Sequence, residues 1–188
     1  GIGKTSLARI FAKTINCSEL RENKDCSDCS TCKDIDENKS LDVIEIDAAS
    51  NNGVDQIREV IESSNYSSIN CQYKGGGGDE VHMLSKAAFN ALLKTLEEPN
   101  TNTIFILATT EVEKIPLTIL SRCQAINFKT LEKKTLIENL ENVCKKENIT
   151  IDTESLSLVA EESRGSARDS LGILEQLMTS LDKNISIN

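Results

Sequence analysis

The sequence predicts an α/β fold, in which helices cover both faces of a parallel β-sheet, followed by a small helical unit. Two observations lead to this prediction. Up to about residue 129, strand-like apolar segments alternate with amphipathic segments, the order typical of a parallel sheet with helical connections. After residue 129 only helical patterns remain. We therefore expect a core domain at residues 1–129 and a helical lid domain at residues 130–188.

Local patterns justify the elements of the first half. A helix is expected in the opening residues, a polar insertion to about residue 40, and a strand at residues 41–46. A second helix follows the turn at residues 51–53. Both helices have an apolar face, which in an amphipathic helix lies toward the core. These faces consist of Leu7, Ile10, Phe11 and Ile15 in the first helix and of Val54, Ile57, Val60 and Ile61 in the second.

The remaining elements follow in the same way. Ser85 is suited to cap a helix that ends at about residue 97, before Pro99. Residues 103–109 are continuously apolar, as in a buried parallel strand. Pro116 suits the first turn of a short helix, and residues 124–128 are compatible with one more strand. Three apolar faces are expected in the lid: Leu136, Ile137, Leu140 and Val143; Leu156 and Val159; and Leu171, Leu174, Leu177 and Leu181.

Composition excludes several classes of protein. The 188 residues are 38% hydrophobic and 27% charged, which is typical of a globular protein. The longest apolar runs, such as residues 104–108, are too short to cross a bilayer, and no signal peptide opens the chain. The net charge of −9 argues against a generic basic coat for nucleic acid. We expect a cytoplasmic protein.

The chain opens on Gly1-Ile-Gly-Lys-Thr5, directly before the first helix, which matches the second half of the P-loop pattern G-x-x-x-x-G-K-[ST]. Backbone N–H groups at a helix N-terminus bind phosphate. Lys4 is expected to reach the β- and γ-phosphates of a nucleotide and the Thr5 hydroxyl to ligate Mg²⁺. The first Gly of the pattern would precede residue 1, so we expect a truncated chain. An incidental Gly-Lys-Thr is the alternative for this motif alone.

Asp79 and Glu80 supply the carboxylates that a P-loop enzyme requires. One carboxylate at the C-terminal end of a strand holds Mg²⁺, and a neighbouring one orients the attacking water. Asp79 suits the first role and Glu80 the second. A helix-capping acidic pair is the alternative. His82 is interpreted as structural, because a single His has no partner for a metal.

Four consecutive glycines at positions 75–78 precede this pair. About four apolar strand residues normally stand there, and replacing buried aliphatic side chains by Gly forgoes roughly 1.5–3 kcal/mol each. That loss rivals the ~5–15 kcal/mol that stabilises a whole domain. We therefore expect the run to displace a strand and hypothesise that the four glycines are not native. A flexible loop is the alternative.

Four cysteines, at the spacing C-x8-C-x2-C-x2-C, predict a metal site. Zn²⁺ prefers four thiolates in a tetrahedron, and two-residue spacers let one turn present successive sulfurs. An iron–sulfur site would require a C-x3-C-P continuation that is absent. Cys71, Cys123 and Cys144 are interpreted as small core residues. The expected ligands of a structural Zn²⁺ are Cys17, Cys26, Cys29 and Cys32.

Several motifs together resemble one family, the gamma/tau subunit of bacterial DNA polymerase III, a clamp-loader ATPase of the AAA+ class. The resemblance covers essentially the whole chain, including a zinc module at about residues 17–32. The glycine run departs from it, because the family has apolar residues there. The matching motifs are Gly3-Lys-Thr-Ser-Leu-Ala-Arg9, Ile44-Glu-Ile-Asp-Ala-Ala-Ser50, Asp79-Glu-Val-His-Met-Leu-Ser85, Phe89-Asn-Ala-Leu-Leu-Lys-Thr-Leu-Glu-Glu-Pro99, Leu107-Ala-Thr-Thr110 and Ile119-Leu-Ser-Arg-Cys123.

The resemblance implies a RecA-like P-loop core and a helical lid that bind ATP, in a subunit of a hetero-oligomeric ring. The ring opens the sliding clamp and releases it around primed DNA. Thr110 matches sensor 1, with Thr109 as the alternative; Arg122 matches an arginine finger acting on the adjacent subunit, and Arg168 matches sensor 2. The implied nucleotide-binding residues are Gly1, Gly3, Lys4, Thr5, Ser6 and Asp79.

Parts of the sequence are compatible with three other functions. A catalytically inactive clamp-loader-like scaffold is the main alternative, and the glycine run together with the incomplete P-loop favours an impaired ATPase for this chain. A zinc-dependent nucleic-acid-binding protein is disfavoured, because residues 17–40 contain four basic and seven acidic side chains. A helicase is disfavoured by the lack of arginine-rich motifs. No polymerase site is visible, so a DNA-directed DNA polymerase label would reflect holoenzyme membership.

Overall fold

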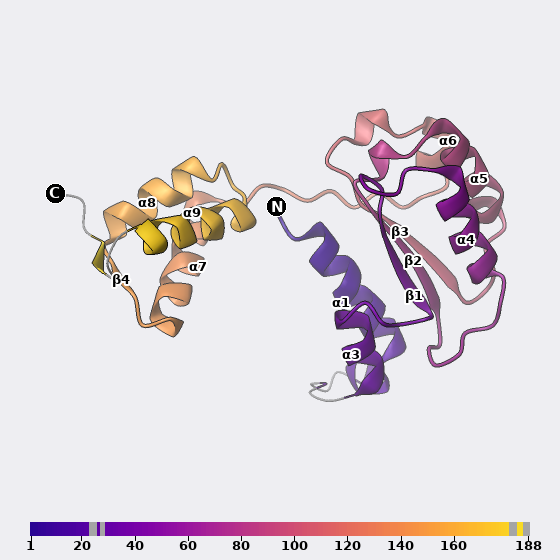
Figure 1. The fold of residues 1–188 in the computed structure, drawn as a ribbon, viewed down its shortest axis with the longest axis horizontal. Coiled ribbons are helices and arrows are strands. Elements are labelled where there is room, and N and C mark those ends of the chain that lie inside the picture. The colour runs from indigo at the N-terminus through magenta and orange to yellow at the C-terminus, as the bar shows by residue number, and fades with distance from the viewer. Residues whose placement is uncertain (23–25, 27–28, 181–183, 186–188) are drawn as a thin grey trace. The chain divides into compact units, whose positions relative to one another are not determined.

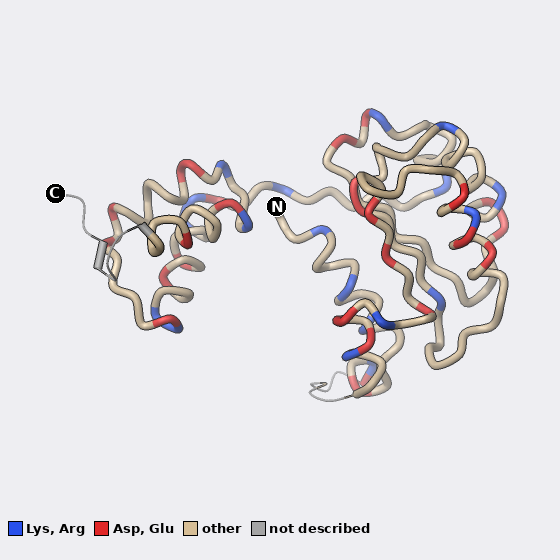
Figure 2. Tube along the Cα trace, in the orientation of Figure 1, with Lys and Arg blue, Asp and Glu red and all other residues tan. Residues whose placement is uncertain are grey.

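The computed structural model describes residues 1–22, 26, 29–180 and 184–185 (Figure 1). The chain divides into two compact units, one formed by residues 5–126 and the other by residues 1–4 together with 127–188. Within the described part, no helix is long and apolar enough to span a membrane. Lys and Arg are mixed with Asp and Glu along the helices of both units (Figure 2).

A three-stranded parallel sheet forms the centre of the first unit. Its strands are β1 (Val43–Asp47), β2 (Lys74–Asp79) and β3 (Thr103–Leu107), in the order β1-β2-β3. Helices α1 (Lys4–Asn16), α4 (Val54–Ser64) and α5 (Lys86–Glu97) connect or flank the strands. The prediction of an α/β fold with a parallel sheet is confirmed.

Short helices complete this unit. The polar insertion contains α2 (Ser18–Arg21) and α3 (Ser30–Asp36). The 3₁₀ helix η1 (Val81–Met83) follows β2, while η2 (Val112–Lys114) and α6 (Leu117–Leu120) follow β3. The predicted Ser85 cap is confirmed: the Ser85 hydroxyl accepts a hydrogen bond from the Ala88 N–H (3.2 Å) at the start of α5. The short helix predicted at Pro116 is also present, although Pro116 directly precedes α6 and does not lie in its first turn.

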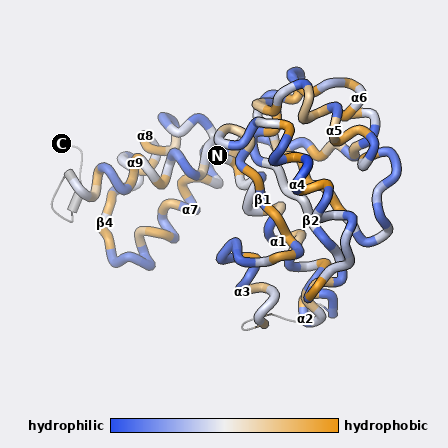
Figure 3. The backbone as a smooth tube through the Cα atoms, turned by 45° about the vertical axis from the view of Figure 1, so that its right-hand side comes forward, coloured by the Kyte–Doolittle hydropathy of each residue, from blue (hydrophilic) through white to orange (hydrophobic). Residues whose placement is uncertain are grey.

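The glycine run was expected to displace a strand, and that expectation is wrong. Residues 75–78 form the middle of β2, paired with Val43–Ile46 of β1 on one side and Ile104–Leu107 of β3 on the other. A central strand uses both its backbone edges, and this ladder depends only on backbone groups. Figure 3 shows the contrast, with β1 largely hydrophobic in colour and β2 pale.

The apolar face predicted for the first helix is wrong in part. Leu7, Ile10 and Phe11 are 44%, 52% and 44% exposed, whereas Ala12 is buried. Ala8 and Ala12 of α1 face the glycines of β2 across the space beneath the helix. Ile15 alone of the predicted face lines the space beneath the helix.

The hydrophobic core of this unit lies on the opposite face of the sheet, between the sheet, α4, α5 and α6. Its buried members are Ala48, Ile57, Val81, Leu84, Ala88, Phe89, Leu92, Ile115 and Ile119. The apolar face predicted for the second helix contributes Ile57 to it, and α5 contributes Ala88, Phe89 and Leu92, with Leu96 only partly buried.

Residues 124–128 do not form a strand, although the sequence was compatible with one. Ile126 is 70% exposed. A strand requires a neighbour for its backbone groups, and within the described residues these positions pair with no strand of the sheet.

Over its described residues, the second unit contains three helices, α7 (Lys133–Lys146), α8 (Thr153–Glu162) and α9 (Ala167–Ser180), as predicted for the lid. A short parallel pair, β4 (Thr150–Ile151) and β5 (Asn184–Ile185), was not predicted. Leu171 is 38% exposed, against expectation, and Leu181 lies outside the described residues. The buried core consists of Leu136, Leu140, Cys144, Leu156, Val159, Ala160 and Leu174.

Candidate functional site

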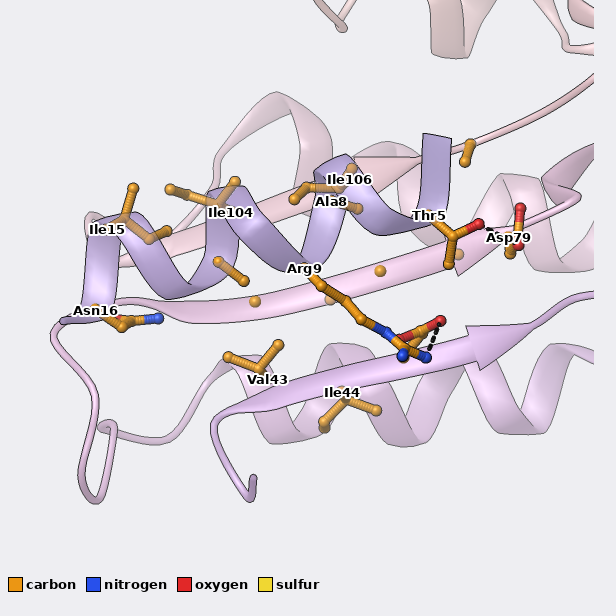
Figure 4. A pocket seen from close by; sticks show the side chains of 17 residues that line it. Thr5, Ala8, Arg9, Ile15, Asn16, Val43, Ile44, Asp79, Ile104 and Ile106 are labelled. Atoms are coloured by element: carbon orange, nitrogen blue, oxygen red, sulfur yellow. Dashed lines mark hydrogen bonds and ion pairs between the residues drawn. The ribbon is translucent and has the colours of Figure 1, made fainter. Parts of the chain in front are cut away.

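The carboxyl end of β2 places Asp79 beside the first turn of α1. The Thr5 hydroxyl donates a 2.7 Å hydrogen bond to Asp79 Oδ2, as the dashed line in Figure 4 shows. Asp79 Oδ1 accepts from the Glu80 N–H (3.0 Å), and the Asp79 carbonyl accepts from Ala48 (3.0 Å). The two sequence motifs, 74 residues apart, therefore meet at the edge of the sheet where parallel α/β folds bind ligands.

Glu80 follows in a left-handed backbone conformation, with φ +48° and ψ 43°. Such a conformation costs a non-glycine residue about 1–3 kcal/mol and is concentrated at functional sites. Glu80 Oε2 accepts two hydrogen bonds from Thr110, one from the N–H (3.2 Å) and one from the hydroxyl (2.8 Å). Of the two threonines considered for sensor 1, Thr110 is therefore the one that contacts Glu80.

Thr109 contacts His82 instead. The distance between His82 Nδ1 and Thr109 Oγ1 is 3.0 Å, and His82 Nε2 lies 3.1 Å from Glu111 Oε1. The Lys114 ammonium, 2.7 Å from the other Glu111 oxygen, holds the pKa of Glu111 below its usual value. Sequence reasoning missed Glu111, because one glutamate in a polar loop belongs to no pattern.

Arg122, just after α6, lies on the surface of the first unit. Its Nε donates to Glu97 Oε1 (3.0 Å), its Nη2 also pairs with Glu97, and its Nη1 donates to the Thr118 carbonyl (2.6 Å). Among the described residues, no hydrogen bond or ion pair joins Arg122 to Thr5, Asp79 or Glu80. Arg122 is thus available at a surface, apart from the cluster at the end of β2.

In the second unit, the opening residues lie against the start of α9. The Arg168 N–H donates to the Gly1 carbonyl (3.3 Å), and the Gly1 amino group pairs with Ser166 and Asp169. A Cβ added to Gly1 would lie 3.1 Å from Arg168 Cβ, which favours glycine at this position. Gly3 has φ +88°, a conformation that also favours glycine.

Lys4 and Ser6 lie in the first turn of α1, where Ser6 is exposed. A helix N-terminus with unpaired N–H groups suits an anion. The structure thus brings Thr5 together with Asp79, Glu80 with Thr110, and Gly1 with Arg168.

The four clustered cysteines come together in space. Their Sγ atoms all lie within 4.8 Å of one another, and none forms a disulfide. Two of the separations are 3.6 Å (Cys26–Cys32) and 3.7 Å (Cys17–Cys29). A tetrahedral site with Zn–S bonds of ~2.3 Å has sulfurs about 3.8 Å apart. The cluster therefore fits a zinc ion.

Backbone N–H groups contact two of these thiols, whereas burial raises the pKa of a third, Cys32. The backbone N–H of Leu20 lowers the pKa of Cys17 to about 7, which favours the thiolate that binds metal. Cys29 Sγ accepts from the Cys32 N–H (3.3 Å) and caps α3. Part of the predicted module, residues 23–25 and 27–28, lies outside the described residues.

The other three cysteines differ in burial. Cys71 and Cys144 are buried as predicted, and burial raises the pKa of Cys71 to about 11. Cys123 is half-buried at the edge of the core.

A small cavity of about 40 Å³ lies between α1 and the sheet. Figure 4 shows its lining, in which the glycines of β2 leave an open strip between Val43 and Ile104. The Nδ2 of Asn16, which lines the cavity, has no hydrogen-bond partner in the described residues. The cavity is almost entirely apolar and carries no catalytic group beyond Thr5 and Asp79 at its edge.

Sequence profiles of two families match the chain. The profile described as "DNA polymerase III, delta subunit" matches residues 1–132. The profile described as "DNA polymerase III clamp loader subunit, ATPase lid domain" matches residues 135–180.

Curated proteins of the same kind are similar over nearly the whole chain. The tau subunit of Bacillus subtilis DNA polymerase III is 47% identical over 95% of this chain and 32% of its own length. The gamma subunit of Buchnera aphidicola (subsp. Acyrthosiphon pisum) is 43% identical over 100% of this chain and 52% of its length. The Escherichia coli tau subunit is 41% identical over 99% of this chain and 29% of its own length. The chain thus spans about a third to a half of these relatives.

Solved structures share the fold. The Holliday junction branch migration motor RuvB of Thermotoga maritima has a TM-score of 0.68 and 19% identity, over 100% of this chain and 55% of that one. A gamma subunit-related protein of Thermotoga maritima DNA polymerase III has a TM-score of 0.50 and 20% identity, over 93% of this chain and 62% of that one. The AAA+ fold and the family profiles agree, and the chain belongs to the gamma/tau family of bacterial DNA polymerase III clamp-loader subunits.

Proposed function

We propose that this chain comes from a clamp-loader subunit that binds and hydrolyses ATP to open the sliding clamp and load it on primed DNA. The observation that carries the proposal is the hydrogen bond between Thr5 and Asp79. It joins the hydroxyl of the phosphate-loop motif to the carboxylate at the end of the central strand, the two oxygen ligands that a P-loop enzyme directs at Mg²⁺.

Each residue has a stated role in this proposal. Lys4 binds the β- and γ-phosphates, with Gly1, Gly3 and Ser6 forming the rest of the phosphate loop. Thr5 and Asp79 supply the hard oxygen ligands that Mg²⁺ prefers. The ion neutralises charge on the phosphates when it is bound. Glu80 orients the attacking water, and Thr110 holds the carboxylate of Glu80 in place.

Two arginines complete the proposed machinery. Arg122 lies on the surface next to a short helix, as an arginine finger for an adjacent subunit requires. Its pairing with Glu97 would be exchanged for the γ-phosphate held by the neighbour. Arg168, at the start of α9, is proposed as sensor 2. We also propose that the core and lid domains are residues 1–129 and 130–188.

The proposed partners are the other clamp-loader subunits, the sliding clamp and primed DNA. The protein would act in the cytoplasm, in chromosome replication, as part of the DNA polymerase III holoenzyme. The mixed surface charge suits a protein that contacts DNA through an assembled ring rather than through a basic face of its own (Figure 2).

We propose that Cys17, Cys26, Cys29 and Cys32 hold one structural Zn²⁺. The sulfur separations support this, and four protein ligands leave no open position for catalysis. Metal analysis of protein purified under reducing conditions should give one zinc per chain, lost when two of the cysteines are replaced by serine. Absence of zinc from the reduced protein would contradict the site.

Turnover in the assembled complex tests the main proposal. In the full-length parent with its partner subunits, clamp and primed DNA, Arg122→Ala should leave ATP affinity unchanged and lower ATP hydrolysis about 10³-fold or more. Glu97→Gln is the control, because it frees Arg122 without removing it. Unchanged hydrolysis in Arg122→Ala would contradict the finger role.

A scaffold that hydrolyses no ATP is the second candidate, and the side-chain-free central strand favours it. The same assay therefore includes a protein in which Gly75 and Gly77, where an added Cβ meets no atom closer than 3.7 Å, are replaced by aliphatic residues. We propose that the glycine run impairs hydrolysis by loosening the support of Asp79 and Glu80. Absence of hydrolysis from both proteins would favour the scaffold.

A further inference from the structure

His82 occupies a polar cluster that the proposed chemistry does not use. Its side chain is only 9% exposed, yet both ring nitrogens have polar partners. Nδ1 lies 3.0 Å from Thr109 Oγ1 and 3.3 Å from Glu80 Oε2, while Nε2 lies 3.1 Å from Glu111 Oε1. A buried imidazole that joins the segment after β2 to the segment after β3 has a defined position.

The hydrogen bonds close the turn at residues 109–111 on this imidazole. The Glu111 N–H donates to Thr109 Oγ1 (3.0 Å), and Thr109 Oγ1 and the Glu111 carboxylate contact the two ring nitrogens of His82. The imidazole therefore links the side chains at both ends of the turn in one ring of contacts.

Thr110 lies in the middle of that turn. With Thr109 and Glu111 both fixed to His82, the N–H and hydroxyl of Thr110 are directed at Glu80 Oε2. Glu80 needs such support, because a glutamate does not by itself favour the left-handed backbone conformation that it adopts here. The Val81 N–H, which donates to the Ala108 carbonyl (3.0 Å), ties the same two segments together.

We propose that His82 is a positioning residue for ATP hydrolysis, which acts on Glu80 directly and through Thr109 and Thr110, without touching nucleotide. The inference rests on the proposed function, since it needs Glu80 to orient the attacking water. Groups that orient metal ligands typically change activity by about 10- to 100-fold when they are removed, and we expect an effect of similar size here. Lys4, Thr5 and Asp79 lie outside this ring of contacts, so ATP binding should not depend on it.

The experiment uses the full-length parent in its assembled complex, with ATP affinity and single-turnover hydrolysis measured separately. His82→Leu should slow hydrolysis about 10-fold or more while ATP affinity stays within about twofold. Thr109→Val, which breaks the same ring with little change in volume, should slow hydrolysis similarly. Thr109→Ser, which keeps the hydroxyl, should restore most of the rate. This matched pair keeps the test decisive if His82→Leu fails to fold.

A double-mutant cycle separates a positioning role from a packing role. In a Glu80→Gln background, His82→Leu should cause no further loss, because both changes act on the same carboxylate. An equal loss in both backgrounds, or equal rates for Thr109→Val and Thr109→Ser, would overturn the inference and leave the proposed function standing. Normal hydrolysis by Glu80→Gln alone would contradict the proposed role of Glu80 and the inference with it.

Discussion

Helices are attached to the two faces of the core sheet by different chemistry. On one face, α4 and α5 pack on alternate residues of the outer strands, including Ile46, Phe105 and Leu107. On the other face, α1 has only Ala12 and Asn16 buried, and polar contacts connect it to its surroundings. These contacts are Thr5–Asp79, Arg9–Glu45 and Lys13–Asp36.

The central strand shows why the faces differ. A Cβ added to Gly76 would lie 2.9 Å from the Phe105 ring, and one added to Gly78 would lie 2.5 Å from Val81 Cγ1, so neighbours have filled that side. A Cβ added to Gly75 would lie 3.7 Å from the nearest side-chain atom, and one added to Gly77 would lie 3.8 Å from the nearest backbone atom. The cavity beneath α1 lies on this second side.

The comparison teaches that a strand without side chains is tolerated where large neighbours can close over it. Phe105, Val60 and Val81 reach the empty positions from their own elements. On the α1 face, no side chain closes over the strand in this way, and the space remains. The backbone ladder and anchors at the ends of β2 must then hold the strand in position.

The largest effect is expected at the anchor before β2. The buried carboxylate of Asp42 accepts hydrogen bonds from the N–H groups of Ile69, Asn70 and Cys71, at 2.7–3.0 Å. Asp42→Asn places an amide opposite these donors and should lower the free energy of unfolding by about 3 kcal/mol. Urea unfolding followed by circular dichroism measures this. Asp55→Asn, on the exposed surface of α4, is the control and should change it by less than about 0.5 kcal/mol.

The same anchor predicts a dependence on pH. Burial of Asp42 opposes ionisation, but the three N–H donors and the Lys74 ammonium outweigh it and hold the pKa of Asp42 below its usual value. The stabilisation is therefore complete above the pKa of an unfolded Asp and is lost as pH falls through the lower folded pKa. Asp42→Asn should remove this part of the acid sensitivity. An unchanged acid transition in the variant would show that β2 does not depend on this anchor.

Filling the cavity should give the next largest effect, with the opposite sign. Gly77→Val adds a side chain on the open face, where burial contributes ~1.5–3 kcal/mol and removal of a strand glycine a further ~0.5–1 kcal/mol. We expect the free energy of unfolding to rise by about 2 kcal/mol. The same urea experiment applies, read on the transition of residues 5–126.

Gly78→Val is the matched comparison, the same change one residue along and on the other face. Its Cβ would overlap Val81, which is 2% exposed, so we expect a loss of about 1–3 kcal/mol. Equal effects of the two substitutions would contradict the difference between the faces. Two gains would mean that the core can repack around Gly78.

Most of the fold could be predicted because its signals are local. The Ser85 cap, the apolar periodicity of α4 and the run at 103–107 each specify an element without knowledge of the rest. The role of residues 75–78 could not be predicted in this way, because β2 is specified by pairing on both its edges rather than by its own residues. The apolar face predicted for α1 was wrong for the same reason, because the residues of α1 that face the sheet depend on the absence of side chains from β2.

The candidate site was predictable to a similar degree. Thr5, Asp79 and the four clustered cysteines stand in spaced motifs whose chemistry is visible in the sequence, and the structure brings each set together. The ring of contacts around His82 was not visible, because it joins residues 27 and 29 positions apart with no repeating spacing. A single His had therefore been interpreted as structural.

The smallest effect is expected for the ion pair that joins α1 to β1. Arg9 Nε and Nη2 donate to the two oxygens of Glu45, at 2.8 and 3.2 Å, and this bond raises the pKa of Arg9. Because both side chains are partly exposed, Glu45→Gln should lower the free energy of unfolding by only about 0.5 kcal/mol, and high salt should reduce the difference from the parent. Glu59→Gln is the matched control, because Glu59 is an exposed residue of α4, the helix that packs on the apolar face of the sheet.

A double variant tests whether polar contacts hold α1 in place. If they do, the effect of Glu45→Gln on the free energy of unfolding should become smaller once Gly77→Val has filled the cavity, because packing then also holds α1 on the sheet. Strictly additive effects would show that the ion pair and the cavity act independently, and that the polar attachment of α1 does not compensate for the missing side chains of β2.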